Sequence, residues 1–509
     1  AQLNDIFAGT VTKAITKHIR ENNESCDNDQ LPCKIELKEK NFSVIKEYLK
    51  KNPALKLTDF FSIQDVTRMS VASVCPYWSP IVPKEYDLHF DGAQKILYRG
   101  LDGIDFIIHQ RKKGCPYYEQ YEAYTDADVI IFNSLKYKLE TLMNRKPLTE
   151  LEIIDECDEF LDSFATQERV SINRLLGALA IIPDHAAIKE LIDITNTVKR
   201  KYNPGEEIYP VARSLIEQLL KTMLGSKELL YELAVDEHSY AFHLEEVAQL
   251  FADFMNESYF SIEKNEEDII INIVTTNLKK RFAEMAAKNK IMIFMSGTLH
   301  SPDVLRTIFG IERSIVIEAE TKQQGELLVC KHGSELDCKY ANFQSQYITR
   351  EDYLQVFSKT IACAKKPALV HLTSFSDLPD DKEKYMYELD NLPTQNEIIN
   401  EQIADPLGEK IRAFKNKEFD VLFTTKCSRG IDFPGDSCNS IVISRFPYPN
   451  ISALFWKILK KTHPQHFMQF YMDKARRELL QKIYRGLRSK NDRVYLLSPD
   501  SRVLDFKMG

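Results

Sequence analysis

The sequence predicts an α/β protein built from two parallel-sheet domains. Short apolar segments typical of buried strands alternate with segments of helical periodicity in two separate regions of the chain. A helix-rich block, from about residue 170 to 287, separates these two regions. The length of 509 residues exceeds what one hydrophobic core usually organises, which favours several domains.

Composition and charge exclude several classes of protein. With 44% hydrophobic and 28% charged residues, the chain can form large cores, and bulk disorder is not expected. A net charge of −8 argues against coating of nucleic acid by bulk charge, although a local basic groove remains compatible with it. No apolar run is long enough to cross a bilayer, and the first residues lack the pattern of a signal peptide. We therefore expect a cytoplasmic protein, associated with the nucleoid in a prokaryote, without a membrane partner. Because the sequence does not begin with Met, we expect a trimmed chain rather than a complete one.

The first third of the chain contains helices and two strands. Phe42–Lys51 has a helical pattern, which Asn52–Pro53 ends. A second helix, rich in aromatic residues, is expected from Tyr117 to about Ala127. Asp128–Asn133 and Leu151–Asp155 have the compact apolar pattern of buried strands.

The middle block is predicted to be an all-helical insertion, after which the chain returns to a strand at Lys290–Met295. Its predicted helices share a spacing of three and four between apolar residues, and they are Leu175–Ile182, Ala187–Tyr202, Val211–Leu224, Ala241–Asn256 and Asn277–Ala287.

The last region again alternates between strands and helices, which predicts a second parallel sheet. The predicted strands are Ile315–Ala319, Ala368–Leu372, Asp420–Thr424, Ser440–Ser444 and Val494–Leu497. The helices between or beside them include Asp352–Cys363, Gly408–Lys415 and Phe467–Leu487.

Two carboxylates, Asp155 and Glu156, follow the strand at Leu151–Asp155. This position is the carboxyl edge of a parallel sheet, where ligands bind in open α/β folds. There an Asp can hold Mg²⁺, and the following Glu can orient or deprotonate a water molecule. Paired acids after a strand are solvated loop residues about as often as they are site residues. The pair alone therefore does not decide between a metal site and a solvated loop.

Three further motifs carry candidate site residues. Ser296 and Thr298 follow the strand at Lys290–Met295 and could relay a hydrogen bond, although a helix N-cap is the simpler interpretation. Gly430 and Asp432 lie in a loop that could approach a phosphate chain, or in an ordinary strand-to-helix loop.

The third motif has helical spacing. Gln481, Arg485 and Arg488 fall on one helical face, from which arginines can reach triphosphate oxygens. A solvated basic face is the more common cause of this spacing.

Taken in order, these motifs resemble superfamily 2 helicases. With Cys115–Tyr118 and three earlier cysteines ahead of Asp155–Glu156, the chain is similar to the XPD/DinG family of iron–sulfur DNA helicases. The resemblance implies two RecA-like motor domains, the first carrying a cluster insertion and a helical arch. The implied boundaries are 1–25, 116–168 and 288–320 for the first motor domain, 26–115 for the iron–sulfur domain, 169–287 for the arch and 321–509 for the second motor domain.

The resemblance also implies an activity. ATP hydrolysis would drive 5′→3′ movement along single-stranded DNA and the unwinding of forked DNA, in repair or replication. Asp155 would bind Mg²⁺, Glu156 would activate water, and Arg485 and Arg488, with Gln481 beside them, would contact the triphosphate. Ser296, Thr298, Gly430 and Asp432 would couple hydrolysis to motion. We expect a monomer.

Four cysteines precede the carboxylate strand: Cys26, Cys33, Cys75 and Cys115. Four thiolates on a loop-rich segment are suitable ligands for a [4Fe–4S] cluster or for Zn²⁺, and their spacing alone does not separate these from free thiols. The family resemblance favours the iron–sulfur cluster.

The chain departs from the family pattern in three ways. Asp158 stands where a His is usual, and Arg429 stands where an acidic residue is common. No Gly-x4-Gly-Lys-[Ser/Thr] phosphate loop occurs anywhere in the 509 residues. The alternative hypothesis is therefore a non-catalytic DNA-binding scaffold. A nuclease that uses Asp155 and Glu156 ranks last, because no further acids accompany them at recognisable spacing.

Candidate DNA contacts lie in two regions. Near Cys115, the basic run Arg111–Lys113 could touch phosphates, and the tyrosines between 117 and 124 could stack on bases or pack in a core. In the second motor domain, Pro447–Asn450, Phe455–Lys457 and the following lysines could face a single strand.

Overall fold

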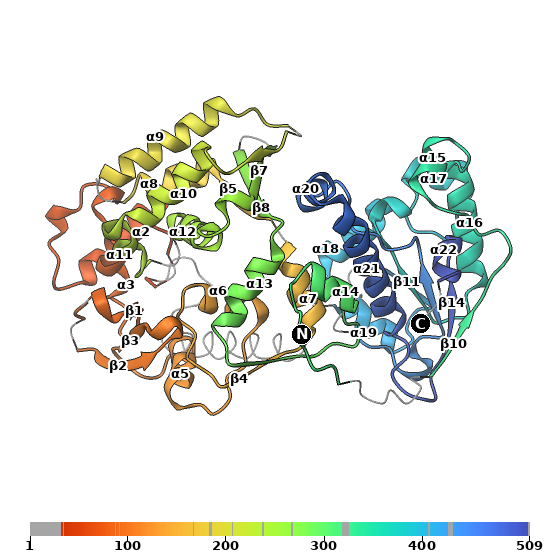
Figure 1. Ribbon diagram of the computed structural model, residues 1–509, viewed down its shortest axis with the longest axis horizontal. Helices are drawn as coiled ribbons and strands as arrows, with labels where there is room; N and C mark the ends of the chain where they lie inside the picture. The colour runs from red at the N-terminus through yellow and green to blue at the C-terminus, as the bar shows by residue number, and fades with distance from the viewer. Residues whose placement is uncertain are drawn as a thin grey trace. The chain divides into compact units, whose positions relative to one another are not determined.

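The computed structural model divides into two compact units (Figure 1). The first unit comprises Ala1–Met295, Ile308–Gly310 and Ser452–His463, and the second comprises Ser296–Thr307, Ile311–Ile451 and Pro464–Gly509. The structure describes residues 32–33, 35–86, 88–90, 92–165, 167–182, 186–205, 207–236, 239–265, 268–317, 325–405, 408–425 and 431–506. None of the described helices has the length and apolar character needed to cross a bilayer.

A parallel sheet of five strands forms the centre of the second unit. This confirms the predicted α/β class, and four of the strands lie where the sequence predicts them. In spatial order the strands are β10 (Glu326–Val329), β14 (Arg493–Leu497), β13 (Ser440–Ile443), β11 (Ala368–His371) and β12 (Val421–Thr424).

Helices cover both faces of this sheet, on opposite sides of its strands in Figure 1. On one face, α19 (Glu409–Lys415) and α21 (Pro464–Ile483) pack against alternate residues of the strands, such as Leu369 and Ile441. On the other face, α16 (Arg350–Cys363) and α18 (Gln395–Ala404) pack against the intervening residues, such as Val370 and Val442. Strands buried on both faces explain the nearly continuous apolar pattern that made them predictable.

The first unit contains a smaller parallel sheet of two strands, β4 (Leu151–Ile154) and β9 (Ile291–Phe294). Leu151 is in register with Ile291, and Ile153 with Ile293. All four of these side chains are exposed, with Ile153 and Ile291 each at 58% of their full accessibility. Helix α7 (Cys157–Asp162) follows β4 along the chain, and helix α13 (Leu278–Ala287) precedes β9.

The cysteine-bearing region folds around a three-stranded antiparallel sheet that the sequence analysis did not predict. Its strands, in the order β1–β3–β2, are Ile81–Pro83, Asp105–Gln110 and Gln94–Arg99. Helix α2 (Phe42–Lys51) has the predicted bounds, whereas the predicted helix at Tyr117–Ala127 consists of the short helices α4 (Pro116–Glu119), η6 (Gln120–Glu122) and α5 (Ala123–Asp126).

The prediction that 169–287 is all helical is wrong. The five predicted helices are present as α8 (Ile172–Leu179), α9 (Ala186–Lys201), α10 (Leu215–Gly225), α12 (Tyr240–Phe251) and α13, and a further helix, α11 (Lys227–Leu233), was not predicted. Helices α8 to α12 pack on an antiparallel sheet of β5 (Glu168–Ser171), β8 (Asp268–Thr275), β7 (Ser258–Asn265) and β6 (Tyr209–Pro210). The run of β-branched residues in β8 favours a strand, because such side chains pack well on a pleated surface.

Two predicted strands are not strands in the described residues. Asp128–Asn133 and residues 315–317 form no sheet pairs, and Val129, Ile131 and Ile317 are exposed. Both segments are apolar, as a strand would be. In the described part of the chain, however, no neighbouring strand forms hydrogen bonds with them. The compact units also differ from the implied domains, because Ser296–Thr307 clusters with the second unit although the sequence interpretation assigned 288–320 to the first motor domain.

Helix α20 (Leu454–Thr462) comes from the C-terminal half of the sequence but belongs to the first unit. It packs against β8, and its apolar residues Leu454, Ile458 and Leu459 are buried. The polypeptide therefore returns to the first unit at Ser452–His463, after it has passed through most of the second unit.

Candidate functional site

A connected set of predicted site residues lies at the C-terminal end of helix α21 in the second unit. Gln481 is in the helix, whereas Arg485 and Arg488 follow its last residue, Ile483, so the prediction that all three share one helical face is wrong. Gln481 and Arg485 are 5% and 4% exposed. Arg485 Nη2 donates to Gln481 Oε1 at 2.9 Å, and Gln481 Nε2 donates to Thr298 Oγ1. These contacts bring the Ser-Gly-Thr motif and the end of α21 together.

Asp432 joins the same set from its loop after β12. Its Oδ1 accepts from Arg485 Nη1 at 2.9 Å and also from Arg488 Nη2. The Asp432 side chain remains 45% exposed, whereas Arg485 is buried. One carboxylate thus balances two guanidinium groups and holds them side by side, an arrangement that would suit a ligand bearing several phosphate oxygens.

Residues that the sequence analysis missed support this network. The backbone N–H of Ser301, just beyond the Ser-Gly-Thr motif, donates to Asp473 Oδ1 at 2.8 Å, and Arg477 donates to the other oxygen of the same carboxylate at 2.8 Å. Ser296 Oγ accepts from the N–H of Thr298 at 3.0 Å. The segment that carries Thr298 is therefore anchored to α21 at a second point.

His371 lies beneath the same helix end and was also missed. It ends β11 and is 1% exposed. Burial lowers the pKa of its imidazole well below the usual value, the nearby cations Lys482 and Arg485 lower it further, and a hydrogen bond to the Lys482 backbone opposes the shift. A neutral ring that contacts the final turn of α21 helps to hold Gln481 and Arg485 in place.

Asp155 and Glu156 lie at the carboxyl end of β4, in the first unit, as the sequence predicts. Asp155 is exposed, and its Oδ1 accepts from the Glu156 N–H at 2.9 Å. Glu156 has a left-handed backbone with φ of 48° and precedes α7. The N–H of Cys157 donates to the carbonyl of Met295 at 3.0 Å, which ties the turn to the end of β9.

Two predicted site residues cannot be placed with the others. Gly430 and Cys26 lie outside the described residues. Asp158, which stands where the family has a coupling His, is fully buried.

Three of the four predicted cluster ligands, Cys33, Cys75 and Cys115, lie in the described part of the first unit. Cys33 and Cys75 both pack against the cluster that contains Trp78 and Phe90. Burial raises the pKa of the Cys115 thiol, hydrogen bonds from the Tyr118 and Tyr117 backbone oppose this, and Cys75 adds to the rise. Thiol chemistry fits an iron–sulfur cluster, but within the described part of the chain no three candidate ligands are close enough to form a metal-binding group.

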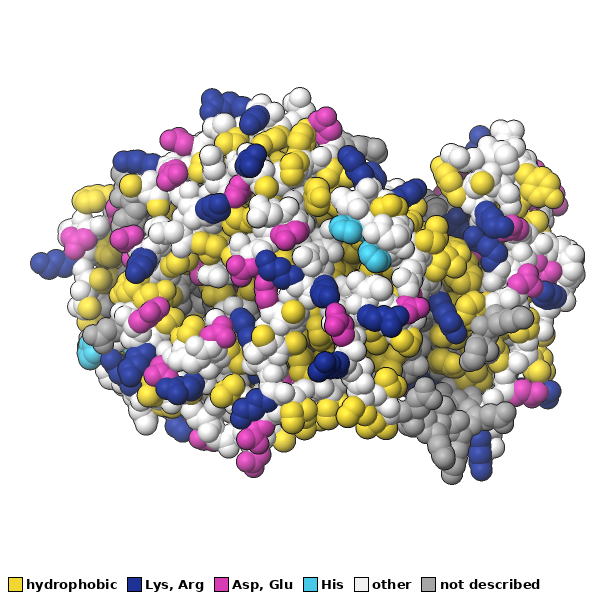
Figure 2. Space-filling view, in the orientation of Figure 1, with side chains coloured by type: hydrophobic (Ala, Val, Ile, Leu, Met, Phe, Trp, Pro, Cys, Tyr) yellow, Lys and Arg dark blue, Asp and Glu magenta, His cyan; other side chains and the backbone are white. Residues whose placement is uncertain are grey.

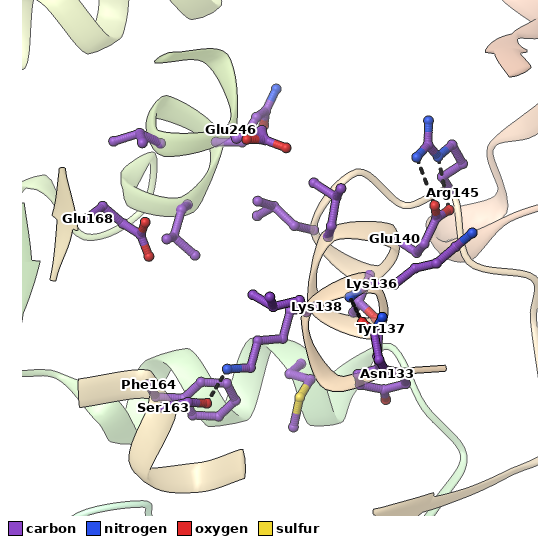
Figure 3. Close-up of a pocket in the computed structure, with 18 of the residues that line it drawn as sticks. Asn133, Lys136, Tyr137, Lys138, Glu140, Arg145, Ser163, Phe164, Glu168 and Glu246 are labelled. Carbon is purple, nitrogen blue, oxygen red and sulfur yellow. Dashed lines mark hydrogen bonds and ion pairs between the residues drawn. The ribbon is translucent and has the colours of Figure 1, made fainter. Parts of the chain in front are cut away.

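A cavity of about 710 Å³ lies within the first unit, between α6 (Ser134–Leu142), α12 and α13 (Figure 3). Tyr117 and Tyr121, two of the tyrosines considered for base stacking, line it. Tyr124 is buried in an aromatic core with Tyr98 and Tyr121, so packing is its main role. On the face shown in Figure 2, Lys and Arg alternate with Asp and Glu, without a broad basic surface.

Comparison with known proteins agrees with this arrangement. Residues 357–509 match the helicase C-terminal domain family. A curated protein of Methanocaldococcus jannaschii, named as a probable ATP-dependent helicase, is 24% identical over 276 residues, which cover 50% of this chain and 40% of that protein. The chain thus spans less than half the length of this curated relative.

Solved structures of XPD proteins are also similar to the chain. An XPD helicase structure is 17% identical and covers 76% of this chain and 72% of its own, with a TM-score of 0.45. The Xpd4 structure from S. tokodaii is 15% identical, with 75% of each chain covered and a TM-score of 0.45. The match of residues 357–509 to the helicase C-terminal domain family and the similarity to a probable ATP-dependent helicase support the helicase resemblance that the order of the motifs predicted.

Proposed function

We propose that this protein is an ATP-dependent translocase that unwinds DNA, with 5′→3′ polarity on a single strand. The observation that carries the proposal is the network of Thr298, Gln481, Arg485, Asp432 and Arg488 in the second unit. Two guanidinium groups that share one half-exposed carboxylate are preorganised for a polyphosphate, because the phosphate oxygens can replace the carboxylate as acceptors. DNA repair or replication is the process that the family resemblance implies.

In this proposal the two units supply different parts of the chemistry. Asp155 would bind Mg²⁺ at the carboxyl edge of β4, and Glu156 would orient the attacking water. Arg485 and Arg488 would stabilise the charge that develops on the transferred phosphoryl group. Ser296, Thr298 and Asp432 would relay the change, since Thr298 and Asp432 both contact the residues that would sense the phosphates.

A phosphate-binding loop is also required, and the sequence contains none. We propose that a further α/β segment supplies it and covers the exposed face of β4 and β9. Parallel sheets are normally buried on both faces and contain more than two strands. The exposed Leu151, Ile153, Ile291 and Ile293 are the residues that such a segment would bury.

Arg485→Ala in the full-length native protein tests the arginine role. We expect the DNA-stimulated ATPase rate to fall by about 10³-fold, because a guanidinium that contacts the transferred phosphate typically contributes that much. The charge-matched control is Arg493→Ala, since Arg493 forms an exposed pair with Glu326 on β14. An Arg485→Ala protein with a near wild-type ATPase rate and a normal fold would contradict the proposal and favour the DNA-binding scaffold.

The iron–sulfur cluster remains a separate part of the proposal. Cys33, Cys75 and Cys115, together with Cys26, would hold it, and it would supply a rigid element where DNA strands separate. Two observations support this assignment: Cys33 and Cys75 pack on the same apolar cluster, and Cys75 lies close enough to Cys115 to add to the rise that burial causes in the pKa of its thiol. Anaerobic purification with iron and sulfide analysis tests it; a folded, colourless protein without iron, or one that contains zinc instead, would refute the cluster.

A further inference from the structure

The cavity of the first unit contains two cations that form no ion pair with any carboxylate in the described part of the chain. They are Lys138 on α6 and Arg281 on α13, and both line the cavity. Buried cations are normally paired, because a desolvated charge without a counterion is costly. Their arrangement therefore calls for an explanation beyond packing.

Arg281 is 7% exposed, so its guanidinium is almost entirely removed from solvent. Its Nη1 donates to the carbonyl oxygen of Phe164 at 2.7 Å, and its guanidinium carbon lies 5.3 Å from the centre of the Phe251 ring. Its Nη2 has no hydrogen-bond partner in the described structure. One N–H group of a buried guanidinium is thus left available to an acceptor in the cavity.

Lys138 occupies a similar environment. Its Nζ donates to Ser163 Oγ, as Figure 3 shows. The same Nζ lies 5.3 and 5.6 Å from the ring centres of Phe160 and Phe164. Burial lowers the pKa of the Lys138 ammonium to about 8, and the charge of Arg281 lowers it further. Phe164 thus links the two cations, since its ring faces Lys138 and its carbonyl binds Arg281.

The other cations that line the cavity have polar partners. Arg145 forms two hydrogen bonds with Glu140, and Lys288 lies 3.6 Å from Asp102 and 2.6 Å from the side-chain oxygen of Asn144. Three carboxylates act on the two cations through space: Glu168 on both, Glu159 on Lys138 and Glu284 on Arg281. In Figure 3 no interaction joins Glu168 to Lys138.

We propose that Lys138, Arg281 and Ser163 form a phosphate-binding subsite inside this cavity. A phosphate oxygen would accept from Arg281 Nη2 and be attracted by the Lys138 ammonium in a region of low dielectric, where charge-assisted hydrogen bonds are strong. The ligand chemistry is a phosphate group, either in the backbone of single-stranded DNA or in a free phosphate compound. Tyr117 and Tyr121 line the same cavity and would favour DNA, because bases stack on aromatic side chains.

The first arm of the test measures binding of a fluorescent d(T)12 oligonucleotide by anisotropy over a range of salt concentrations. This arm rests on the proposed DNA function. Lys138→Met and Arg281→Met should each weaken binding about tenfold and reduce the slope of log affinity against log salt by about one. Lys199→Met, which removes an exposed lysine of α9, is the charge-matched control and should change affinity less than twofold.

The second arm needs neither DNA nor ATP hydrolysis. Inorganic phosphate, compared with chloride at equal ionic strength, should raise the melting temperature of the wild-type protein and not that of the Lys138→Met, Arg281→Met double variant. In the absence of phosphate, Arg281→Met should melt no lower than wild type, because it removes an unpaired buried charge. A purely structural arginine would instead lose stability on this change.

The outcomes separate the possibilities. A phosphate response that depends on both residues, together with unchanged oligonucleotide binding, would keep the subsite and assign it to a free phosphate compound. A response to neither probe, or the same response in wild type and variants, would overturn the subsite. If Arg485→Ala leaves the ATPase rate unchanged while phosphate still raises the melting temperature through Lys138 and Arg281, that result would count against the proposed function alone.

Discussion

The two parallel sheets of this protein differ in how completely they are covered. Every residue of β11 and β13 in the second unit is buried, whereas alternate residues of β4 and β9 in the first unit are exposed. The local sequence patterns are similar, since each strand is a short apolar run that ends in polar residues. The difference shows that such a pattern predicts a strand but does not reveal how completely the faces of that strand are covered.

Buried charges do not follow this division. In the second unit, Asp500 is fully buried and binds Arg502 and the Phe446 N–H, whereas Asp377 pairs with Arg445 and each still keeps a buried polar atom without a hydrogen-bond partner in the described structure. In the first unit, Glu245 and Arg281 likewise keep such an atom. The two units therefore differ in how their parallel sheets are covered, and not in whether every buried charge is satisfied.

The largest effect is expected when a paired charge of the second unit is removed. Asp500→Ala leaves Arg502 and the Phe446 N–H without their acceptor, which should lower the unfolding free energy of that unit by about 3–5 kcal/mol. Urea denaturation measures the loss. Asp505→Ala, which breaks an exposed pair with Lys331, should cost less than about 1 kcal/mol. Equal losses in the two variants would remove the distinction between buried and exposed pairs.

A pair of core truncations compares the two sheets directly. Leu369→Ala, at a fully buried position of β11, should cost about 2–5 kcal/mol because it leaves a cavity. Ile153→Ala, at a position of β4 that is 58% exposed, should cost less than about 1 kcal/mol. Hydrogen exchange of the strand amides would report each sheet separately. A large loss for Ile153→Ala in this chain would mean that its face is already covered.

Glu245 gives the first unit a specific dependence on pH. Burial, with a smaller contribution from Glu246, raises the pKa of the Glu245 carboxyl to about 7. Between pH 4.5 and 7 the folded state therefore holds a proton that the unfolded state releases. The stability from this group is complete below pH 4.5 and is lost as the pH rises through 7.

Glu245→Gln should make the unfolding free energy of the first unit less dependent on pH over this range, as measured by hydrogen exchange of α12 at several pH values. The exposed Glu228 provides the control as Glu228→Gln. A wild-type pH profile in the Glu245→Gln variant would contradict the raised pKa.

The smallest effect on stability is expected at Asp155. Because this carboxylate is exposed, Asp155→Asn should change the unfolding free energy by no more than about 0.5 kcal/mol. In the full-length native protein the same change should abolish Mg²⁺-dependent ATPase activity, since the metal would lose a ligand. Retained activity with unchanged magnesium dependence would remove Asp155 from the proposed site.

Much of the second unit was predictable because its determinants are local. Four of its five strands are nearly continuous apolar runs, and the helical spacing predicted most of α21 but carried the helix past Ile483, where the turn that holds Arg485 begins. The edge strand β10 was missed because it is short and only partly buried. The β7–β8 hairpin was not predicted, because the whole block was interpreted as helical. The run of β-branched residues in β8 is the signal that favours a strand there.

The parts of the site that depend on non-local contacts were less accessible. The Thr298–Gln481 and Asp432–Arg485 contacts join segments 183 and 53 residues apart, and only the family resemblance brought them together beforehand. His371 and Asp473 had no signal, because a single His in a strand or Asp in a helix is usually a packing or surface residue. Nothing in the sequence distinguishes Arg281 from other arginines. Only the fold shows that its Nη2 has no hydrogen-bond partner in the described structure.

Helix α20 has a practical consequence for dissecting the protein. Because Ser452–His463 is part of the first unit, a fragment that stops at Met295 would lack a helix that packs on β8 and would expose an apolar surface there. Such a fragment should aggregate, whereas co-expression with a peptide spanning α20 should rescue it. The two units are interleaved along the chain, so no single cut separates one from the other.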